Sequence, residues 1–420
     1  MAILLGTQGG DILAWRGVAE LVAEIRGITA ERMTCQLSDE NLDFLEAIQG
    51  RLEEEIGFEE RFAAEFRRAE ESLEHAAYED DFIPLLPRFN QLAQVYFQER
   101  GSVVAVHTLC NAYRDGLVRK ALQLTEDALA TDEKRKPPAP YCLLAAGSTG
   151  RREQTLCVDS FHQFIHEDDE NGGTGYFKEF ARRAALLLGK AGLLRDVDSG
   201  AKVTPFWRCG RKEWRDNNFE VFKNMDQQGV ALLLKRADFR LVHGDASLAD
   251  EMLTVVRSTL DFNQQLIRSP ATAPVVREVG KRIAETPAGL DFFGRFKVEK
   301  GRRHRGRFDL GKYAIAPLVA NIRLMAVDAG LVETSTIGRI KGLQEGGHLS
   351  VELTERLLRA YHDFTRLKIL RQIKEVCETE RTCFIDPQEL SEDEDQRLRT
   401  GMEAVTDLEK IAYLCFTEHG

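Results

Sequence analysis

Apolar residues recur at the spacing of an α-helix from about residue 12 to residue 134, and acidic and basic residues fill the other positions. One such stripe runs through Leu45, Ile48, Leu52 and Ile56. Pro84 and Pro87 interrupt the pattern, and the charged, proline-rich segment 134–140 ends it. We therefore expect an N-terminal helical region over residues 1–137.

The pattern changes after residue 140, where short apolar runs alternate with a helical stretch. Strands are predicted at 141–146, 158–165, 202–207 and 239–243, and a helix at 175–191. Such alternation is typical of an α/β or α+β domain. From about residue 251 the helical period returns, most clearly at 315–327 and 353–373. We expect an α+β fold with a mixed-sheet domain over 138–250, a connector over 251–310 and a C-terminal helical bundle over 311–420.

Composition narrows the classes of function. The 420 residues are 43% hydrophobic and 30% charged, which is typical of a globular protein with two or three domains. The formal net charge of -11 argues against electrostatic binding of nucleic acid or of an anionic membrane over a broad surface. Any anion-binding site must therefore be local.

The cysteines and the N-terminus indicate a compartment. The eight cysteines form no C-x-x-C pair, so we expect reduced thiols in place of disulfides or a zinc site. Residues 1–10 contain no basic residue and only a short apolar run, which fits neither a signal peptide nor a membrane span. We expect a cytoplasmic protein.

The most informative stretch is 147–159, Gly-Ser-Thr-Gly-Arg-Arg-Glu-Gln-Thr-Leu-Cys-Val-Asp, which follows the apolar run 141–146. A buried strand, a tight turn at Gly147 and Ser148 and a helix start would point unpaired backbone N–H groups at an anion such as a polyphosphate. Transfer of a nucleoside monophosphate also needs Mg²⁺ held by carboxylates, and one known arrangement places them at i and i+2 on a strand. Asp159 stands at the first of these positions, and Phe161 at the second.

This stretch resembles the GSxGRxEQTLxTD signature of nucleotidyltransferases related to the N-terminal domain of protein-PII uridylyltransferase, which are often attached to CBS-pair or cyclic-nucleotide-binding domains. The likeness extends over about 100–415, through the segments 111–119, 238–245, 301–310, 336–340 and 385–391. It implies a nucleoside triphosphate and Mg²⁺ as ligands. It also implies a role in signalling, in which a nucleotide is bound or its monophosphate is transferred to a protein.

The resemblance assigns roles to particular positions. It implies that Gly147 and Ser148 hold the β and γ phosphates and that two arginines add positive charge. The residues predicted to bind nucleotide are Gly147, Ser148, Gly150, Arg151, Arg152 and Glu153. Asp159 is the predicted Mg²⁺ ligand and catalytic residue, and Asp238 is the candidate for a further metal-binding, catalytic carboxylate. The alternative for Asp238 is a capping role or an ion pair with Arg240.

Phe161 is the main departure from the signature, because a phenyl ring cannot ligate a hard cation that takes oxygen donors. Glu153 or the acidic run 167–170 compensates only if it folds back toward Asp159. Two functions therefore stay open. One is a working transferase, and the other is a catalytically silent module that binds a nucleotide or a protein partner.

Three further features carry weaker signals. His162 and His166 fall on the strand face opposite Asp159, and a structural or exposed role is favoured over metal binding. The basic run 297–307 either steers a triphosphate, docks an acidic partner or is a solvated connector. Trp207 and Trp214 are expected to anchor the sheet domain against a helix.

Because the helical arms form more than half of the chain, we also expect a protein partner or a homo-oligomer.

Overall fold

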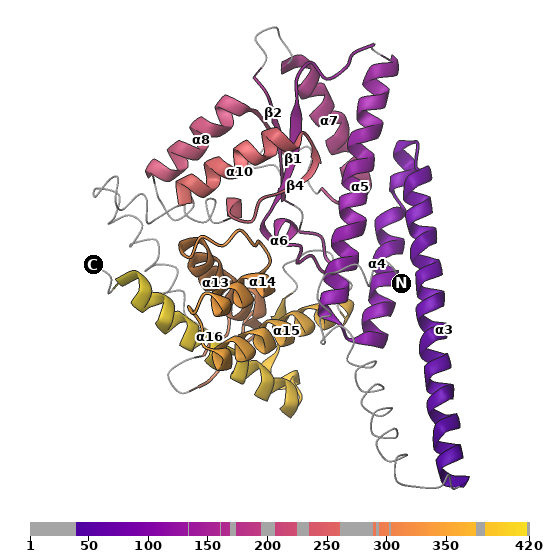
Figure 1. The fold of residues 1–420 in the computed structure, drawn as a ribbon, viewed down its shortest axis with the longest axis vertical. Helices are drawn as coiled ribbons and strands as arrows, with labels where there is room; N and C mark the ends of the chain where they lie inside the picture. The colour runs from indigo at the N-terminus through magenta and orange to yellow at the C-terminus, as the bar shows by residue number, and fades with distance from the viewer. Residues whose placement is uncertain are drawn as a thin grey trace.

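The computed structural model describes residues 39–132, 134–159, 161–168, 174–194, 206–224, 235–260, 289–290, 294–301, 304–374 and 383–417. Figure 1 shows a layer of long N-terminal helices beside a small sheet that carries helices of its own, and a group of C-terminal helices below that sheet. The predicted α+β class, with helical regions on both sides of a mixed sheet, is confirmed.

The N-terminal layer consists of α3 (Asp39–His75), the 3₁₀ turn η1 (Glu79–Phe82), α4 (Leu85–Arg100) and α5 (Val103–Asp132). Pro84 is the residue before α4, and Pro87 lies in its first turn, where a missing N–H costs no helical hydrogen bond. The two prolines that interrupt the apolar pattern of the sequence therefore mark the start of α4. Gly101 ends α4 at a φ of 62°, a left-handed conformation that glycine adopts without strain.

The sheet has four strands in the order β3-β2-β1-β4, namely β1 (Tyr141–Ala146), β2 (Phe161–His166), β3 (Phe206–Gly210) and β4 (Arg240–Gly244). Strand β1 is antiparallel to β2 and β4, and β2 is parallel to β3. The first strand has the predicted bounds. The second begins at 161 and not at 158, the third includes 206–207 of the predicted 202–207, and residues 202–205 lie outside the described part.

Both faces of the sheet are covered. Alternate residues of β1 point in opposite directions, so Leu143 joins a core with α5 and α7 (Thr174–Lys190) while Leu144 joins a core with α10 (Ala246–Leu260). Trp214 of α8 (Arg211–Asn224) lies in the second core, and its indole N–H donates to Gln163 Oε1 at 2.8 Å. This confirms the anchoring role predicted for Trp214, whereas the side chain of Trp207 is not among those described.

The N-terminal helices and the sheet share the first of these cores, which contains Phe89, Leu117 and Leu122 together with Leu143 and Phe164. Residues 134–140 do connect α5 to β1, as the sequence predicts, but they do not separate two hydrophobic cores. The helical layer is therefore part of the support of the sheet.

The C-terminal part has its own core. Its elements are β5 (Phe308–Asp309), the π-helical turn η2 (Gly311–Ile315), α13 (Ala316–Asp328), α14 (Thr336–Glu345), α15 (Val351–Lys374), β6 (Phe384–Ile385), η3 (Pro387–Glu389) and α16 (Glu392–Thr417). The helices predicted at 315–327 and 353–373 correspond to α13 and α15. Strands β5 and β6 pair with each other and brace η2 against the bundle.

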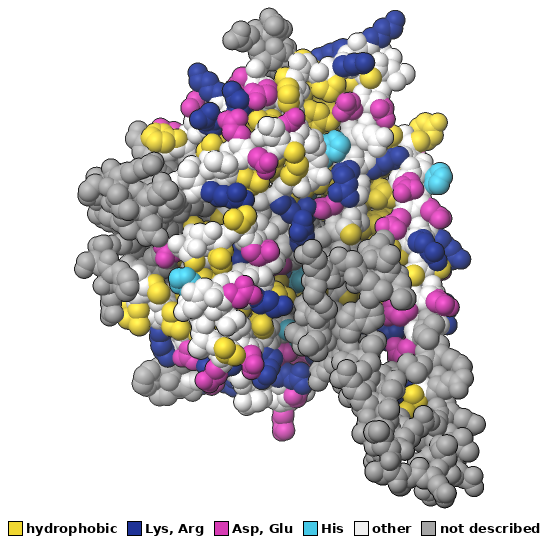
Figure 2. Space-filling view, viewed as in Figure 1, with side chains coloured by type: hydrophobic (Ala, Val, Ile, Leu, Met, Phe, Trp, Pro, Cys, Tyr) yellow, Lys and Arg dark blue, Asp and Glu magenta, His cyan; other side chains and the backbone are white. Residues whose placement is uncertain are grey.

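The surface and the cysteines complete the description. Among the described residues, no helix is long and apolar enough to cross a membrane. On the face shown in Figure 2, basic side chains are interspersed with acidic ones. The described thiols of Cys110, Cys142, Cys209, Cys383 and Cys415 are free. Cys157, however, is disulfide-bonded, so the expectation of reduced thiols throughout is wrong at this position.

Candidate functional site

The chain makes a tight turn where β1 ends and the short helix α6 (Gly147–Gly150) begins. Gly147 has a φ of 59°, which favours glycine, and a Cβ placed there would meet no atom within 4 Å. The first N–H groups of a helix have no acceptor within the helix. The strand, the turn and the helix start thus follow one another as the sequence predicts, with open space at Gly147, and the role of the turn in binding an anion stays a prediction.

The side chains of this turn hold Asp159 beside it. Ser148 Oγ donates to Asp159 Oδ2 at 3.0 Å, and Thr149 Oγ1 donates to the Asp159 carbonyl at 2.9 Å. Asp159 is exposed and lies before β2, not within it. The structure thus brings Gly147, Ser148 and Asp159 together, although the strand-face argument that led to Asp159 does not describe its actual position.

Phe161 is the first residue of β2 and is half-buried. Lys235 Nζ lies 5.8 Å from the centroid of its ring, an arrangement in which the cation is attracted to the face of the ring. A neutral ring with an exposed lysine above it therefore occupies the position predicted for a second carboxylate. Sequence reasoning missed Lys235, which no motif marks.

Arg152 is the exposed cation of the signature stretch. Its φ of 57° is left-handed, which is uncommon and costly for a residue that has a side chain. Strained backbone of this kind persists only where the surrounding structure imposes it, and it clusters at binding sites. The prediction that Arg152 adds charge near the turn is compatible with this placement.

Asp238 lies in a different environment, two residues before β4 and fully buried. Arg151 Nη1 and Arg323 Nη2 both lie 2.7 Å from its Oδ2, and Arg339 Nη1 donates to its Oδ1 at 2.6 Å. Burial alone raises the pKa of Asp238, but the charges of the three arginines outweigh burial and hold that pKa below its ordinary value.

Both oxygens of Asp238 are therefore occupied by guanidinium groups. The predicted alternative partner, Arg240, instead forms a bidentate pair with Asp115 of α5 at 2.7 and 2.9 Å. The assignment of Asp238 as a metal ligand and catalytic residue stays a prediction, and these surroundings favour a structural role.

Three other residues predicted to bind nucleotide are turned into the protein. Gly150 packs so closely that a Cβ there would lie 2.0 Å from the Asp238 carbonyl oxygen. Arg151 Nε donates to Glu153 Oε2 at 2.7 Å, and Glu153 Oε1 accepts the backbone N–H of Thr336 at the start of α14. Gly150, Arg151 and Glu153 thus join the sheet domain to the C-terminal helices, and Glu153 does not fold back toward Asp159.

The acidic run after β2 lies at the other end of that strand. Glu167 accepts from Arg211 at 3.0 Å, and Asp168 accepts the N–H of Lys212, the second residue of α8. A strand of six residues spans roughly 20 Å, so neither carboxylate replaces the one missing at Phe161. Residues 169 and 170 lie outside the described part.

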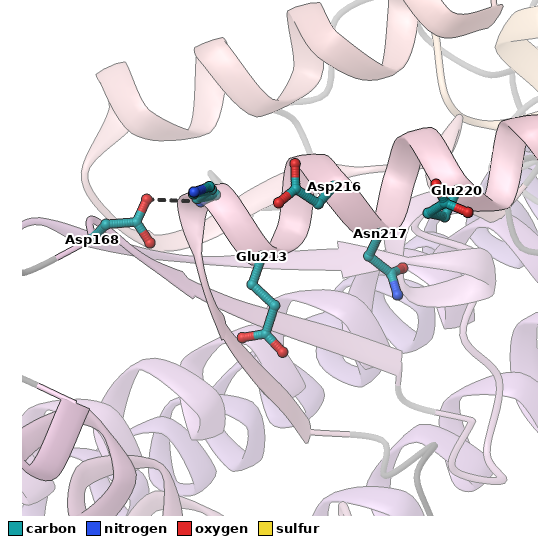
Figure 3. Close-up of a pocket in the computed structure, with 6 residues that line it drawn as sticks. Asp168, Glu213, Asp216, Asn217 and Glu220 are labelled. Carbon is teal, nitrogen blue, oxygen red and sulfur yellow. Dashed lines mark hydrogen bonds between the residues drawn. The ribbon is translucent and has the colours of Figure 1, made fainter.

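Asp168 also borders an open acidic groove along α8, whose other carboxylates are those of Glu213, Asp216 and Glu220. Figure 3 shows the side chains of Glu213 and Asp216 pointing to different sides of the helix, so these carboxylates do not converge on one point. In the described ranges, no group of three or more His, Cys, Asp or Glu side chains has the geometry to hold a metal ion.

The two histidines of β2 have structural surroundings. His166 donates from Nδ1 to the Glu167 carbonyl at 2.9 Å, accepts from Arg208 at Nε2 and stacks on Phe177. His162 is buried and neither of its ring nitrogens has a hydrogen-bond partner. Burial lowers the pKa of His162 to about 4, so the ring is neutral at neutral pH.

Helix α5 contributes residues that sequence reasoning left without a role. Arg114 donates to Gln154 Oε1 at 2.8 Å and to the Leu156 carbonyl at 3.0 Å. Arg240, held by Asp115, donates to the Thr149 carbonyl at 3.0 Å. The signal was available, because Arg114 and Asp115 lie in the segment 111–119 that shares the family resemblance. Helix α5 therefore holds the signature stretch at Gln154 and Leu156 directly and at Thr149 through Arg240.

The donors around the turn fit a two-metal centre poorly. Phe161 offers no oxygen, both oxygens of Asp238 bind arginines, and Glu153 is held by Arg151 and Thr336. Mg²⁺ prefers several oxygen ligands in near-octahedral geometry. Among the predicted ligands, Asp159 alone presents an exposed carboxylate, so no catalytic step is assigned to a metal here.

The small mixed sheet has helices on both faces, and its first strand leads into a Gly-Ser turn beside an aspartate, as expected of a nucleotidyltransferase-like domain. Residues 87–228 match the family model described as "Putative nucleotidyltransferase DUF294", and residues 274–416 match "Putative nucleotidyltransferase substrate binding domain". The chain belongs to this nucleotidyltransferase family. No match to a curated protein was found. Neither family description names protein-PII uridylyltransferase, so that closer relationship stays a prediction.

Proposed function

We propose that the protein binds a nucleoside triphosphate at the turn of Gly147 and Ser148 and does not transfer the nucleoside monophosphate. This proposal rests on the positions and surroundings of the carboxylates that were predicted to bind a metal. Asp159 is exposed at the turn, Phe161 takes the second position, and Asp238 is enclosed by three arginines. The turn that would bind phosphates is intact, whereas the set of oxygen donors that catalysis would need is incomplete.

The charge around the turn supports binding of an anion without a metal. Arg152 and Lys235 are both exposed. Arg152 follows α6 by two residues, and Lys235 lies above the ring of Phe161, which pairs with Ala146, the residue before Gly147. A triphosphate would satisfy the backbone N–H groups of the turn and these two cations. A protein that binds a nucleotide without consuming it is suited to signalling through a protein partner, and that partner and self-association remain proposals.

Thermal unfolding with ATP, UTP, GTP or CTP, each with MgCl₂ or with EDTA, tests nucleotide binding. A ligand at a hundredfold excess over Kd stabilises the folded state by about 2.7 kcal/mol. We expect at least one nucleotide to raise Tm by about 3 °C in EDTA as well as in MgCl₂. The absence of any shift at millimolar nucleotide would contradict binding, and a shift confined to MgCl₂ would contradict metal-free binding.

Matched lysine variants locate the site. Lys235→Met should weaken nucleotide binding, because it removes a cation beside Phe161. Lys212→Met is the control, since Lys212 is exposed at the start of α8, beyond the other end of β2. Equal affinities of the two variants would place the nucleotide elsewhere.

Transfer of label from an α-³²P nucleotide tests the catalytic half of the proposal. We expect the wild-type protein to label neither itself nor added proteins above background. If the wild-type protein transfers label and Asp159→Asn abolishes that transfer, the protein is an active nucleotidyltransferase. The proposal that it binds a nucleotide without catalysis is then wrong.

A further inference from the structure

A cavity of about 570 Å³ lies between the sheet domain and the C-terminal helices. One part of its wall is the segment 236–239 with the last turns of α10, and the other part is the end of α13 with the loop that leads to α14. Ligand sites of small molecules commonly have volumes of this order and commonly lie between domains. The cavity reaches the surface, because the lining residues Thr254 and Arg257 are exposed.

The most informative lining residue is Arg236, which is 1% exposed. Its Nη1 donates to Asn218 Oδ1 at 2.8 Å and its Nη2 donates to Asn217 Oδ1 at 2.9 Å. Both partners are neutral amides. The Nε N–H has no acceptor, and no carboxylate of the described part forms an ion pair with Arg236.

A buried guanidinium without a counter-ion is costly, because desolvation of the charge is not repaid by an opposite charge. Burial accordingly lowers the pKa of Arg236 to about 10, and the Trp214 ring, 5.5 Å from the guanidinium carbon, compensates only in part. The unused Nε N–H and a neighbouring Nη N–H form a planar pair of donors that matches the two oxygens of a carboxylate or a phosphate. Arg236 lines the cavity, so its guanidinium is the group there with which an anion would pair, although neighbouring atoms cover its Nε atom in this structure.

The rest of the lining is largely apolar, with a second cation at the mouth. Apolar side chains come from α10, from the last turn of α13 and from the loop that follows it, namely Leu253, Val256, Val327, Leu331 and Val332. Arg257 is exposed in the last turn of α10. The lining carboxylate, Asp328, ends α13 and has interactions of its own.

We propose that this cavity binds a small organic anion, whose carboxylate or phosphate monoester group pairs with Arg236 while its apolar body packs against α10 and residues 327–332. This ligand is separate from the nucleotide proposed above. The buried Asp238 lies within the segment 236–239, and Thr334, which lines the cavity, donates to the Gly150 carbonyl at 3.2 Å. This hydrogen bond thus links the cavity wall to the last residue of α6.

Four probes with the same apolar body and different head groups test the chemistry, namely octanoate, octyl phosphate, octylammonium and octanol. Titration calorimetry on the full chain should give 1:1 binding of octanoate or octyl phosphate at least tenfold tighter than binding of octanol. Octylammonium should not bind. The relative affinity of octanoate and octyl phosphate identifies the preferred anionic group. Equal affinities for anion, cation and alcohol would overturn the proposal.

Three variants locate the binding. Arg236→Gln should weaken binding of the anion at least tenfold, whereas Arg215→Gln removes an exposed cation of α8 outside the cavity and should leave the affinity unchanged. Thr254→Trp fills the cavity from an exposed position and should abolish binding without disturbing the buried Asn217 and Asn218 partners. Thr254→Trp therefore still tests whether the anion binds in this cavity if Arg236→Gln fails to fold. Unchanged anion affinity in Thr254→Trp would refute the site.

Thermal shift with ATP on the same variants separates this proposal from the proposed function. Thr254→Trp should keep the ATP response and lose the response to octanoate. A protein that binds octanoate but no nucleotide would contradict the proposed function alone.

Discussion

Substitution of Asp238 decides whether this carboxylate is structural or catalytic. Asp238→Asn keeps the shape of the side chain and removes its charge from among Arg151, Arg323 and Arg339, whose side chains are 10%, 11% and 2% exposed. Removal of one partner from a buried ion pair costs about 3–5 kcal/mol, because the remaining charges stay buried without compensation. The folded state should lose stability of this order.

The loss can be converted to a melting temperature. With an unfolding entropy of about 2.1 cal/mol/K per residue, a chain of 420 residues that unfolds as one unit should lose roughly 3–6 °C in Tm. The measurement belongs at pH 7. The pKa of Asp238 is lower in the folded state, so its stabilising effect is present above the unfolded pKa and disappears as the pH falls through the folded pKa.

The assay is thermal and urea unfolding followed by circular dichroism, with Asp245→Asn as a matched control. Asp245 Oδ1 accepts the N–H of Leu248 at the start of α10, and asparagine serves at such a position about as well as aspartate. We expect a change of less than about 0.5 kcal/mol in this control. If Asp238→Asn is as stable as the control but loses a Mg²⁺-dependent activity of the wild type, Asp238 is a metal ligand and the structural reading is wrong.

Three further predictions concern single positions. Because burial holds the pKa of His162 at about 4, the unfolded state binds a proton between about pH 6.5 and 4 that the folded state excludes. Stability should therefore fall by about 3 kcal/mol as the pH is lowered through this window, and urea midpoints should show that His162→Leu removes that part of the fall. Gly150→Ala should cost about 3 kcal/mol or more, since its Cβ would overlap the Asp238 carbonyl, whereas Gly147→Ala should cost only about 1–2 kcal/mol of backbone strain. Similar Tm values for these two glycine variants would contradict the packing. Phe161→Asp should lower stability by about 1–3 kcal/mol and make Tm respond to Mg²⁺, and an unchanged Mg²⁺ response would show that a second carboxylate is not what the site lacks.

Local patterns of the sequence determine the elements of this fold. Six consecutive apolar residues predict β1 with its bounds, because a strand that is covered on both faces needs apolar side chains in both directions. The helical period likewise predicts α7, α13 and α15 to within a few residues. The turn of Gly147 and Ser148 was also predictable, since glycine with a positive φ between a strand and a helix is a local requirement.

Only the tertiary structure decides which charged side chains of the candidate site face solvent. Asp159 and Asp238 are the same residue type near the same sheet, yet one is exposed and the other is fully buried. Two of the arginines that enclose Asp238 are Arg323 and Arg339, which lie 85 and 101 residues further along the chain. The partner of Glu153, Thr336, lies 183 residues away. A carboxylate becomes a metal ligand or an ion-pair partner according to the groups that surround it in space, and spacing along the chain does not contain that information.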